Sequence, residues 1–228
     1  MSASAASLSI SRVASFYKAT VGKKVVMAVT GAILYGFLIG HLLGNLQVYL
    51  GPEALNAYAR NLRAMPALPW AVRAGLAVAV LAHMVAAFQL WRWNRAARPE
   101  RYRSLRAVES SYASRTMLLS GPVIAVFVVY HLMHLTFGNA HPDFDYDLDV
   151  YRNVIGAFQN TPVAMFYVAS MLLIGLHLRH GVWSMFQSAG ISHPRYTPWI
   201  RRLADVSAAL LVAGNVSIPL AILAGYLK

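Results

Sequence analysis

Long runs without a charged residue dominate the chain and set its predicted secondary structure. They cover residues 25–52, 74–91, 116–142, 153–178 and 206–227. Each run reaches the roughly 18 residues that indicate a membrane-spanning helix. A soluble bundle of buried helices is the alternative, but five such runs in 228 residues leave too little polar surface for it. The pattern predicts one all-α domain, 1–228, a bundle of five transmembrane helices spanning about residues 25–50, 70–91, 116–138, 162–186 and 204–227.

Basic residues lie unevenly between the predicted spans, and this indicates an orientation. Fourteen of the 20 Lys and Arg precede span one or lie between spans two and three or four and five. The opposite side holds five basic and five acidic residues. Because Lys and Arg concentrate in cytoplasmic loops, we expect a cytoplasmic N-terminus, an outside C-terminus and an inner (cytoplasmic) membrane location. The longest loops are expected at 92–115 and 138–160, and residues 1–24 lack the apolar core of a signal peptide.

Composition then removes several classes of site and partner. The chain is 58% hydrophobic and 12% charged, with a net charge of +12 and no cysteine. Without cysteine it has no disulfides, no thiolate metal ligands, no iron–sulfur cluster of its own and no covalently attached haem. The positive charge is divided by the spans rather than gathered on one folded face, which argues against a nucleic-acid partner.

Histidines inside the predicted spans are the main candidates for chemistry, because ionisable residues in a bilayer are expensive and usually functional. Spans one to four each carry at least one, and one from each span gives His41, His83, His131 and His177. Counted from the inner ends at about 1.5 Å per residue, His41 and His131 lie roughly 22–24 Å deep. His83 and His177 lie roughly 12–14 Å deep, so two layers are expected about 10 Å apart.

Two histidines on facing helices at one depth can bind one iron from both sides, as cofactor sites in helix bundles are built. The two layers therefore predict two haem b groups, an outer one between His41 and His131 and an inner one between His83 and His177. An interhelical hydrogen bond is the alternative role for a single membrane histidine. Gly36, Gly40 and Gly44 recur every fourth residue, which is typical of close helix packing but also clears room for a flat macrocycle.

Three further polar residues adjoin these candidate ligands. His134 and His180 lie one turn from His131 and His177, so each is an alternative ligand, or a contact for a haem propionate or a quinone. Arg179 is a candidate counter-charge for an inner propionate. His141 and His193 each precede proline in a predicted loop and are interpreted as ordinary loop residues.

Several segments in order match one known pattern. They are Gly22-Lys23-Lys24, Met27-Ala28-Val29-Thr30-Gly31, Gly40-His41-Leu42-Leu43-Gly44-Asn45, Ser114-Arg115, Tyr130-His131 and His177-x-x-x-Gly181-x-Trp183-Ser184. With them the chain, over about residues 15–225, resembles the cytochrome b membrane anchor of succinate dehydrogenase or fumarate reductase, of the single-chain, five-helix, two-haem type.

The resemblance implies a role and a set of partners. His41, His83, His131 and His177 would be the axial ligands of two haem b groups. The cytoplasmic face, including the 92–115 loop, would hold an iron–sulfur subunit that carries a flavoprotein subunit. Electrons would pass to or from a membrane quinone, commonly menaquinone, in the respiratory chain and tricarboxylic acid cycle. Some members have an acidic residue near the outer haem, and the outer loop after span one offers only Glu53.

On this interpretation the chain is an electron-transfer subunit, and catalysis on the dicarboxylate belongs to a partner. The nearest alternative is the cytochrome b of another quinone-linked enzyme, a hydrogenase or formate dehydrogenase. A membrane di-iron oxygenase is suggested by the two His-x-x-His pairs, but it needs its histidines gathered at one depth. A proton-coupled transporter with histidine relays is a third class.

Overall fold

A computed structural model describes residues 15–97, 112–147 and 149–228 of the chain, and those residues form helices joined by short turns without a strand. The long helices are α2 (Thr20–Asn45), α4 (Ala67–Ala96), α5 (Tyr112–Leu135), α7 (Thr161–Ser188) and α8 (Thr197–Leu223). Five segments are long and apolar enough to cross a membrane: α2 with the short 3₁₀ helix η1 (Leu46–Leu50), α4, α5 from Arg115, α7 and α8. The predictions of an all-α fold and five spans are confirmed.

The surfaces of these helices carry large apolar side chains outward. Only 11–28% of the residues in the most apolar window of each span are buried inside the structure. Leu43 is 62% exposed, Leu119 71% and Leu210 65%. Apolar patches of this extent are absent from soluble monomers but are normal where hydrocarbon is the solvent. The chain is therefore a multi-pass membrane protein.

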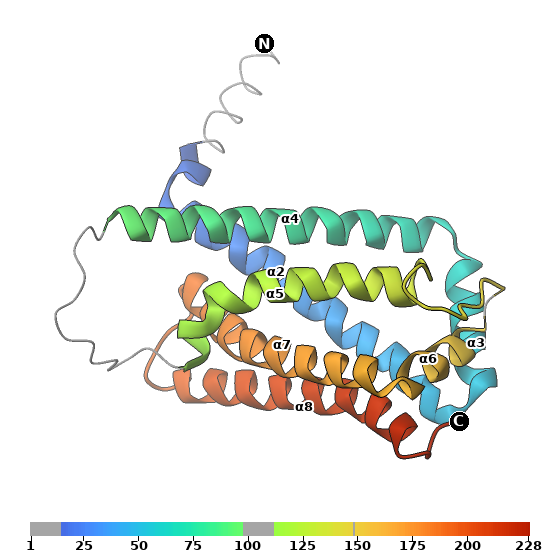
Figure 1. Cartoon of the computed structure of the whole chain (residues 1–228). Helices are drawn as coiled ribbons and strands as arrows, with labels where there is room; N and C mark the ends of the chain where they lie inside the picture. The colour runs from blue at the N-terminus through green and yellow to red at the C-terminus, as the bar shows by residue number, and fades with distance from the viewer. Residues whose placement is uncertain (1–14, 98–111, 148) are drawn as a thin grey trace, which may run out of the picture.

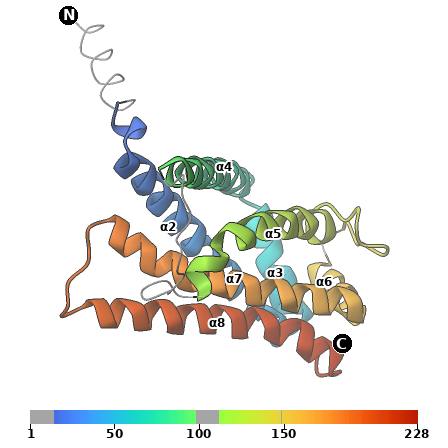
Figure 2. The same ribbon diagram turned by 60° about the vertical axis from the view of Figure 1, so that its left-hand side comes forward.

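The five long helices alternate in direction between two ends of the bundle (Figure 1). α2 begins, α4 ends and α5 begins at one end, which we call the basic end because Lys23, Lys24, Arg92, Arg95 and Arg115 lie there. The opposite end, which we call the cap end, carries α3 (Pro52–Arg63), α6 (Val150–Gln159) and the C-terminus. Figure 2 shows α8 running beside α7 along one side of the bundle.

The long helices differ in how many other helices they pack against, and this leaves space between two pairs of them. α7 packs against α8 and α5, and α2 packs against α4 and α7. Within the described residues, α4 packs closely only on α2 and α3, and α5 only on α7 and α6. Consequently α4 is not packed closely on α7, nor α2 on α5. Helices in direct contact lie about 8–10 Å apart, so these two pairs of helices leave space between them.

Two short helices form a folded layer at the cap end, where the sequence predicted only loops. The 138–160 segment contains α6, so that part of the prediction is wrong. The reason is amphipathic packing, because α6 buries Ile155, Ala157 and Phe158 in a cluster with Val48 and Leu55. A ten-residue helix of this kind carries too short an apolar pattern to be separated from a loop by sequence.

Asp149 ties the layer together at the N-terminus of α6. Its carboxylate accepts the backbone N–H of Arg152 at 3.0 Å and the side-chain amide of Asn56 at 2.9 Å. The carbonyl of that amide accepts the N–H of Tyr151 at 3.0 Å. The pKa of Asp149 lies below its ordinary value of 3.8, chiefly because the Arg152 N–H and then the Asn56 amide stabilise the carboxylate.

Asp149→Ala is expected to lower the stability of the cap end by about 1 kcal/mol, the usual effect of losing a helix N-cap. Asp149→Asn keeps an acceptor for the Arg152 N–H and is the matched control. Because the folded-state pKa is lowered, the ionised carboxylate stabilises the fold fully above pH 3.8, and this is lost as pH falls through the lowered pKa. Thermal unfolding in detergent measures both effects, and equal stability of the alanine and wild-type proteins would contradict the assignment.

Candidate functional site

The structure brings the four span histidines together two by two. On the side nearer the basic end, the ring centres of His83 on α4 and His177 on α7 lie 6.5 Å apart. Nearer the cap end, the ring centres of His41 on α2 and His131 on α5 lie 5.8 Å apart. We keep the names inner pair for His83 and His177 and outer pair for His41 and His131. These are the pairs that the sequence predicted.

The separations within each pair suit a shared metal ion. If both imidazoles of a pair bound one metal ion from opposite sides, bonds of about 2 Å and about 1 Å from each nitrogen to its ring centre would place the ring centres roughly 6 Å apart. The observed 5.8 and 6.5 Å lie on either side of that value. The ring planes meet at 87° in the outer pair and 58° in the inner pair. Either angle would be compatible with a shared ion, because each imidazole can rotate about its own metal–nitrogen bond.

The two pairs lie at different levels of the bundle. The neighbours of the inner pair, Thr30 on α2 and Ser120 on α5, each precede an outer ligand by eleven residues. At about 1.5 Å per residue, eleven residues span roughly 16 Å along either helix axis. The inner and outer pairs therefore form two separate layers, as the sequence predicted.

Hydroxyl groups hold both rings of the inner pair. Thr30 Oγ1 lies 3.1 Å from His83 Nδ1, and Ser120 Oγ lies 3.1 Å from His177 Nδ1. Each hydroxyl also donates to a backbone carbonyl of its own helix. A bond made through Nδ1 leaves Nε2 of each ring available as a ligand, because the two imidazole nitrogens act separately.

Aromatic groups surround the outer pair. Phe37 stacks on His41 with ring centres 5.3 Å apart, and Phe127 stacks on His131 at 5.9 Å. The buried phenol of Tyr167 lies 3.4 Å from His131 Nδ1 and 3.0 Å from His134 Nδ1. The outer pair thus has an apolar, aromatic lining with one phenol against Nδ1 of His131.

Glycines leave open space beside the histidines. A Cβ added at Gly36, Gly40, Gly121 or Gly181 would meet no atom within 4 Å outside its own helix and neighbours. Gly44 differs, because a Cβ there would come within 2.7 Å of the Tyr58 hydroxyl. In the every-fourth-residue series of α2, Gly44 is therefore the one glycine that serves close packing against another part of the described residues. Together with the spaced helices and the imidazole separations, the open glycines fit a flat macrocycle at each pair.

The alternative ligands are placed differently. His134 is buried, with 2% exposure, and its ring stacks on His141 at 5.1 Å with the planes 24° apart. Near-parallel stacked rings do not direct their nitrogens at one metal ion between them. His180 lies one turn nearer the basic end than His177, and Arg179 pairs with Asp205 of α8 at 2.6 Å. A role for His134, His180 or Arg179 toward a propionate or quinone stays a prediction.

Sequence reasoning missed four residues of this region: Thr30, Ser120, Tyr167 and His141. Eleven residues are just over three helical turns, so Thr30 shares a face with His41, and Ser120 with His131. This repeated hydroxyl–histidine spacing was a usable signal in the sequence. His141 gave no such signal: it lies in a loop, as predicted, but it is buried, with 8% exposure, and its Nε2 lies 3.1 Å from the Asn153 carbonyl.

A cavity of about 700 Å³ opens beside His141 at the cap end. Its lining includes His134, Asp143, Arg152 and Lys228, so it reaches from the end of α5 to the C-terminus. Nδ1 of His141 is buried without a hydrogen-bond partner in the described part of the chain. The cavity therefore combines polar side chains with a position one helical turn beyond the outer pair.

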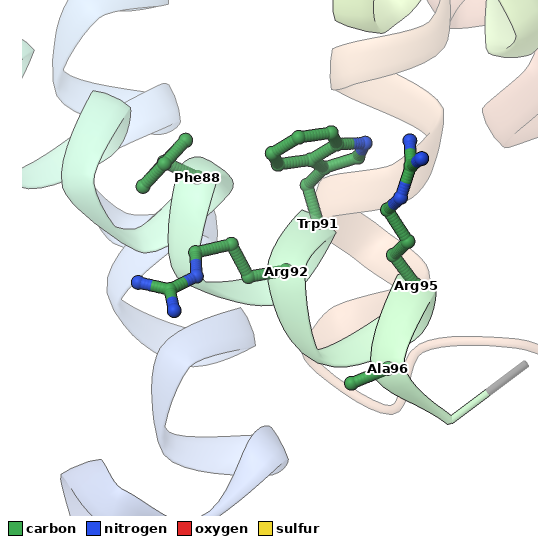
Figure 3. A pocket seen from close by; sticks show the side chains of 5 residues that line it. All are labelled: Phe88, Trp91, Arg92, Arg95 and Ala96. Carbon is green, nitrogen blue, oxygen red and sulfur yellow. The ribbon is translucent and has the colours of Figure 1, made fainter. Parts of the chain in front are cut away.

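A shallower hollow of about 380 Å³ lies at the basic end of α4 (Figure 3). Phe88, Trp91, Arg92, Arg95 and Ala96 line it, and the two guanidinium groups point to opposite sides of Trp91. Arg95 lies over the Trp91 ring at 5.9 Å. Exposed cations beside aromatic rings are typical of the level where a helix leaves the hydrocarbon.

Comparisons with protein-family models, with curated proteins and with solved structures found no match for this chain.

Proposed function

We propose that the chain is a dihaem cytochrome b, the membrane anchor of a succinate:quinone oxidoreductase of the succinate dehydrogenase or fumarate reductase type. The observation that carries the proposal is the pair of facing imidazole sites, stacked along one bundle and supplied by four different helices. His41 and His131 would hold the outer haem, and His83 and His177 the inner one. Each bound haem would supply an iron that accepts and releases one electron.

The protein's own contribution to this function is position and environment. Four helices fix the imidazoles, and the hydroxyls of Thr30, Ser120 and Tyr167 orient three of them. Phe37 and Phe127 surround the outer pair with apolar rings. Burial, ligand type and hydrogen bonding to the ligands together set a haem potential. Two sites roughly 16 Å apart, counted along the helices, span much of a bilayer core of about 30 Å.

The distribution of charge supports a cytoplasmic basic end that docks an iron–sulfur subunit, with the flavoprotein subunit beyond it. Arg92 and Arg95 expose their guanidinium groups at this end (Figure 3), and Lys24 and Arg115 add to the charge. With that end inside, the N-terminus is cytoplasmic, the C-terminus is outside and the protein belongs to the inner membrane. The dicarboxylate reaction would take place on the flavoprotein subunit.

The cavity at the cap end supports a site for the quinone, menaquinone or another. It adjoins the outer pair through His134, and its lining offers hydrogen-bond donors from Arg152 and Lys228. A quinone headgroup carries two carbonyl oxygens that need such donors. Electrons would then travel between the partner at the basic end and the quinone at the cap end through both haems.

The test is purification of the full chain from its native membranes, followed by a dithionite-reduced minus oxidised spectrum. We expect a b-type band with two haems per chain, and flavin and iron–sulfur subunits with succinate–quinone activity in the same preparation. A b-type band with a hydrogenase or formate dehydrogenase partner would assign the chain to the alternative complex. A preparation without haem would overturn the proposal and favour a transporter.

A further inference from the structure

We infer that Thr30 and Ser120 are positioning residues of the inner haem, each holding one axial imidazole through Nδ1 in the tautomer that leaves Nε2 for iron. The inference rests on the proposed function, and it extends that function to residues outside the ligand set. Thr30 Oγ1 lies 3.1 Å from His83 Nδ1, and Ser120 Oγ lies 3.1 Å from His177 Nδ1. The equal geometry on two separate helices is the observation that points to it.

Besides its contact with a histidine, each hydroxyl has a hydrogen bond to a backbone carbonyl of its own helix. Thr30 Oγ1 donates to the Val26 carbonyl at 2.7 Å, and Ser120 Oγ donates to the Met117 carbonyl at 3.3 Å. A hydroxyl has one hydrogen and two acceptor lone pairs. On the proposed function, iron would take Nε2, so the proton of each neutral imidazole is on Nδ1 and the hydroxyl oxygen accepts it, while the hydroxyl hydrogen goes to the backbone carbonyl.

The burial of Thr30 and Ser120 bears on whether the hydroxyl or the histidine depends on the hydrogen bond between them. Thr30 is 8% exposed and Ser120 is 3% exposed, and buried polar atoms generally have at least one hydrogen-bond partner. Each hydroxyl already meets this requirement through its own helix backbone. The bond to the histidine is therefore not required by the hydroxyl, and its effect is to fix the ring and its tautomer, as partners of metal-bound histidines do.

Each of these hydroxyls is on a different helix from the histidine that it contacts. Thr30 is on α2 and holds a ligand of α4, while Ser120 is on α5 and holds a ligand of α7. In return, Tyr167 of α7 lies against Nδ1 of His131 on α5. Because a ligand and its positioning hydroxyl are on different helices, a small change in helix packing would reach the ligand. The inner pair uses two aliphatic hydroxyls, and the outer pair uses a phenol.

An acceptor on Nδ1–H makes an imidazole more basic and a stronger donor to iron. A stronger donor favours the oxidised iron and lowers its reduction potential. Removing the acceptor from one inner ligand therefore raises the potential of the inner haem. The outer haem keeps its own ligands and hydrogen bonds, so its potential should stay where it is.

The experiment is a potentiometric titration of both haems in the purified full complex carrying Thr30→Val or Ser120→Ala. We expect the inner haem to titrate at a higher potential in each variant and the outer haem to titrate as in the wild type. Tyr167→Phe is the matched control and should move only the outer haem. The His83→Ala variant should keep only the outer haem, so the single redox transition in its titration identifies the outer haem.

Hydroxyl-retaining variants separate positioning from packing. If Thr30→Val or Ser120→Ala loses the inner haem, Thr30→Ser and Ser120→Thr should retain it, and their loss of the haem as well would overturn the inference. An inner haem that keeps its wild-type potential in both hydroxyl-free variants would also overturn it, as would equal shifts of both haems. Absence of haem from the wild-type protein would instead be a failure of the proposed function.

Discussion

Replacing His83 or His177 with alanine is expected to remove the inner haem and leave the outer haem bound. The two rings face each other at 6.5 Å from α4 and α7, two helices that are not packed closely on each other in the described residues. Once one imidazole is gone, no second strong ligand holds the iron on that side. The outer pair, roughly 16 Å away along the helices, keeps both of its ligands.

The measurement is the haem content per chain with the reduced minus oxidised spectrum, which should fall from two haems to one. His180→Ala is the matched control, because His180 lies one turn from His177 on the same helix and should not reduce the haem content. If His180→Ala removed a haem and His177→Ala did not, the ligand assignment on α7 would be wrong. Loss of the outer haem alone from the His83→Ala variant would contradict the arrangement of the two sites.

Replacing His131 with alanine is expected to remove the outer haem, whereas replacing His134 is expected to leave both haems bound. His131 faces His41 at 5.8 Å between ring centres. His134 instead stacks on His141 and Tyr130, and its Nδ1 lies 3.0 Å from the Tyr167 hydroxyl. The two residues are three positions apart on α5, so each variant removes the same chemistry from almost the same depth.

Spectra and haem content of the two variants, measured side by side, decide the assignment. His134→Ala should alter the surroundings of Tyr167 and so shift the outer haem spectrum or potential without loss of haem. His41→Ala should reproduce the loss seen with His131→Ala, because either ligand is required. Retention of both haems in His131→Ala with loss of one in His134→Ala would transfer the ligand role to His134.

The five long helices were predictable from the sequence because few backbone conformations are stable in a bilayer. A chain in hydrocarbon must satisfy its backbone hydrogen bonds internally, so long charge-free runs indicate helices whatever their neighbours are. The five runs accordingly match α2 with η1, α4, α5, α7 and α8. The short helices α3 and α6 lie beyond the ends of the five apolar segments, where packing decides the structure, and the sequence pattern did not separate α6 from a loop.

The histidine pairs were predictable for a related reason, since depth follows from counting residues along helices of alternating direction. The pairing of His41 with His131 and of His83 with His177 needs only that count. The helices themselves extend further than the charge-free runs, since α2 begins before its run and α4 ends after its own.

The sequence alone determined that this chain has five helices long and apolar enough to cross a membrane, with histidines at two levels along them, because hydrophobic length and residue count are properties of each helix separately. Tertiary structure decided which histidine of His131 and His134 faces His41. It also placed Thr30 and Ser120 against Nδ1 of the inner pair and buried His141 beneath the cap end. Those facts depend on how far each helix is rotated about its axis and on which helices are neighbours. Residues three apart differ by only about 60° around a helix, so a small rotation changes which side chain points inward.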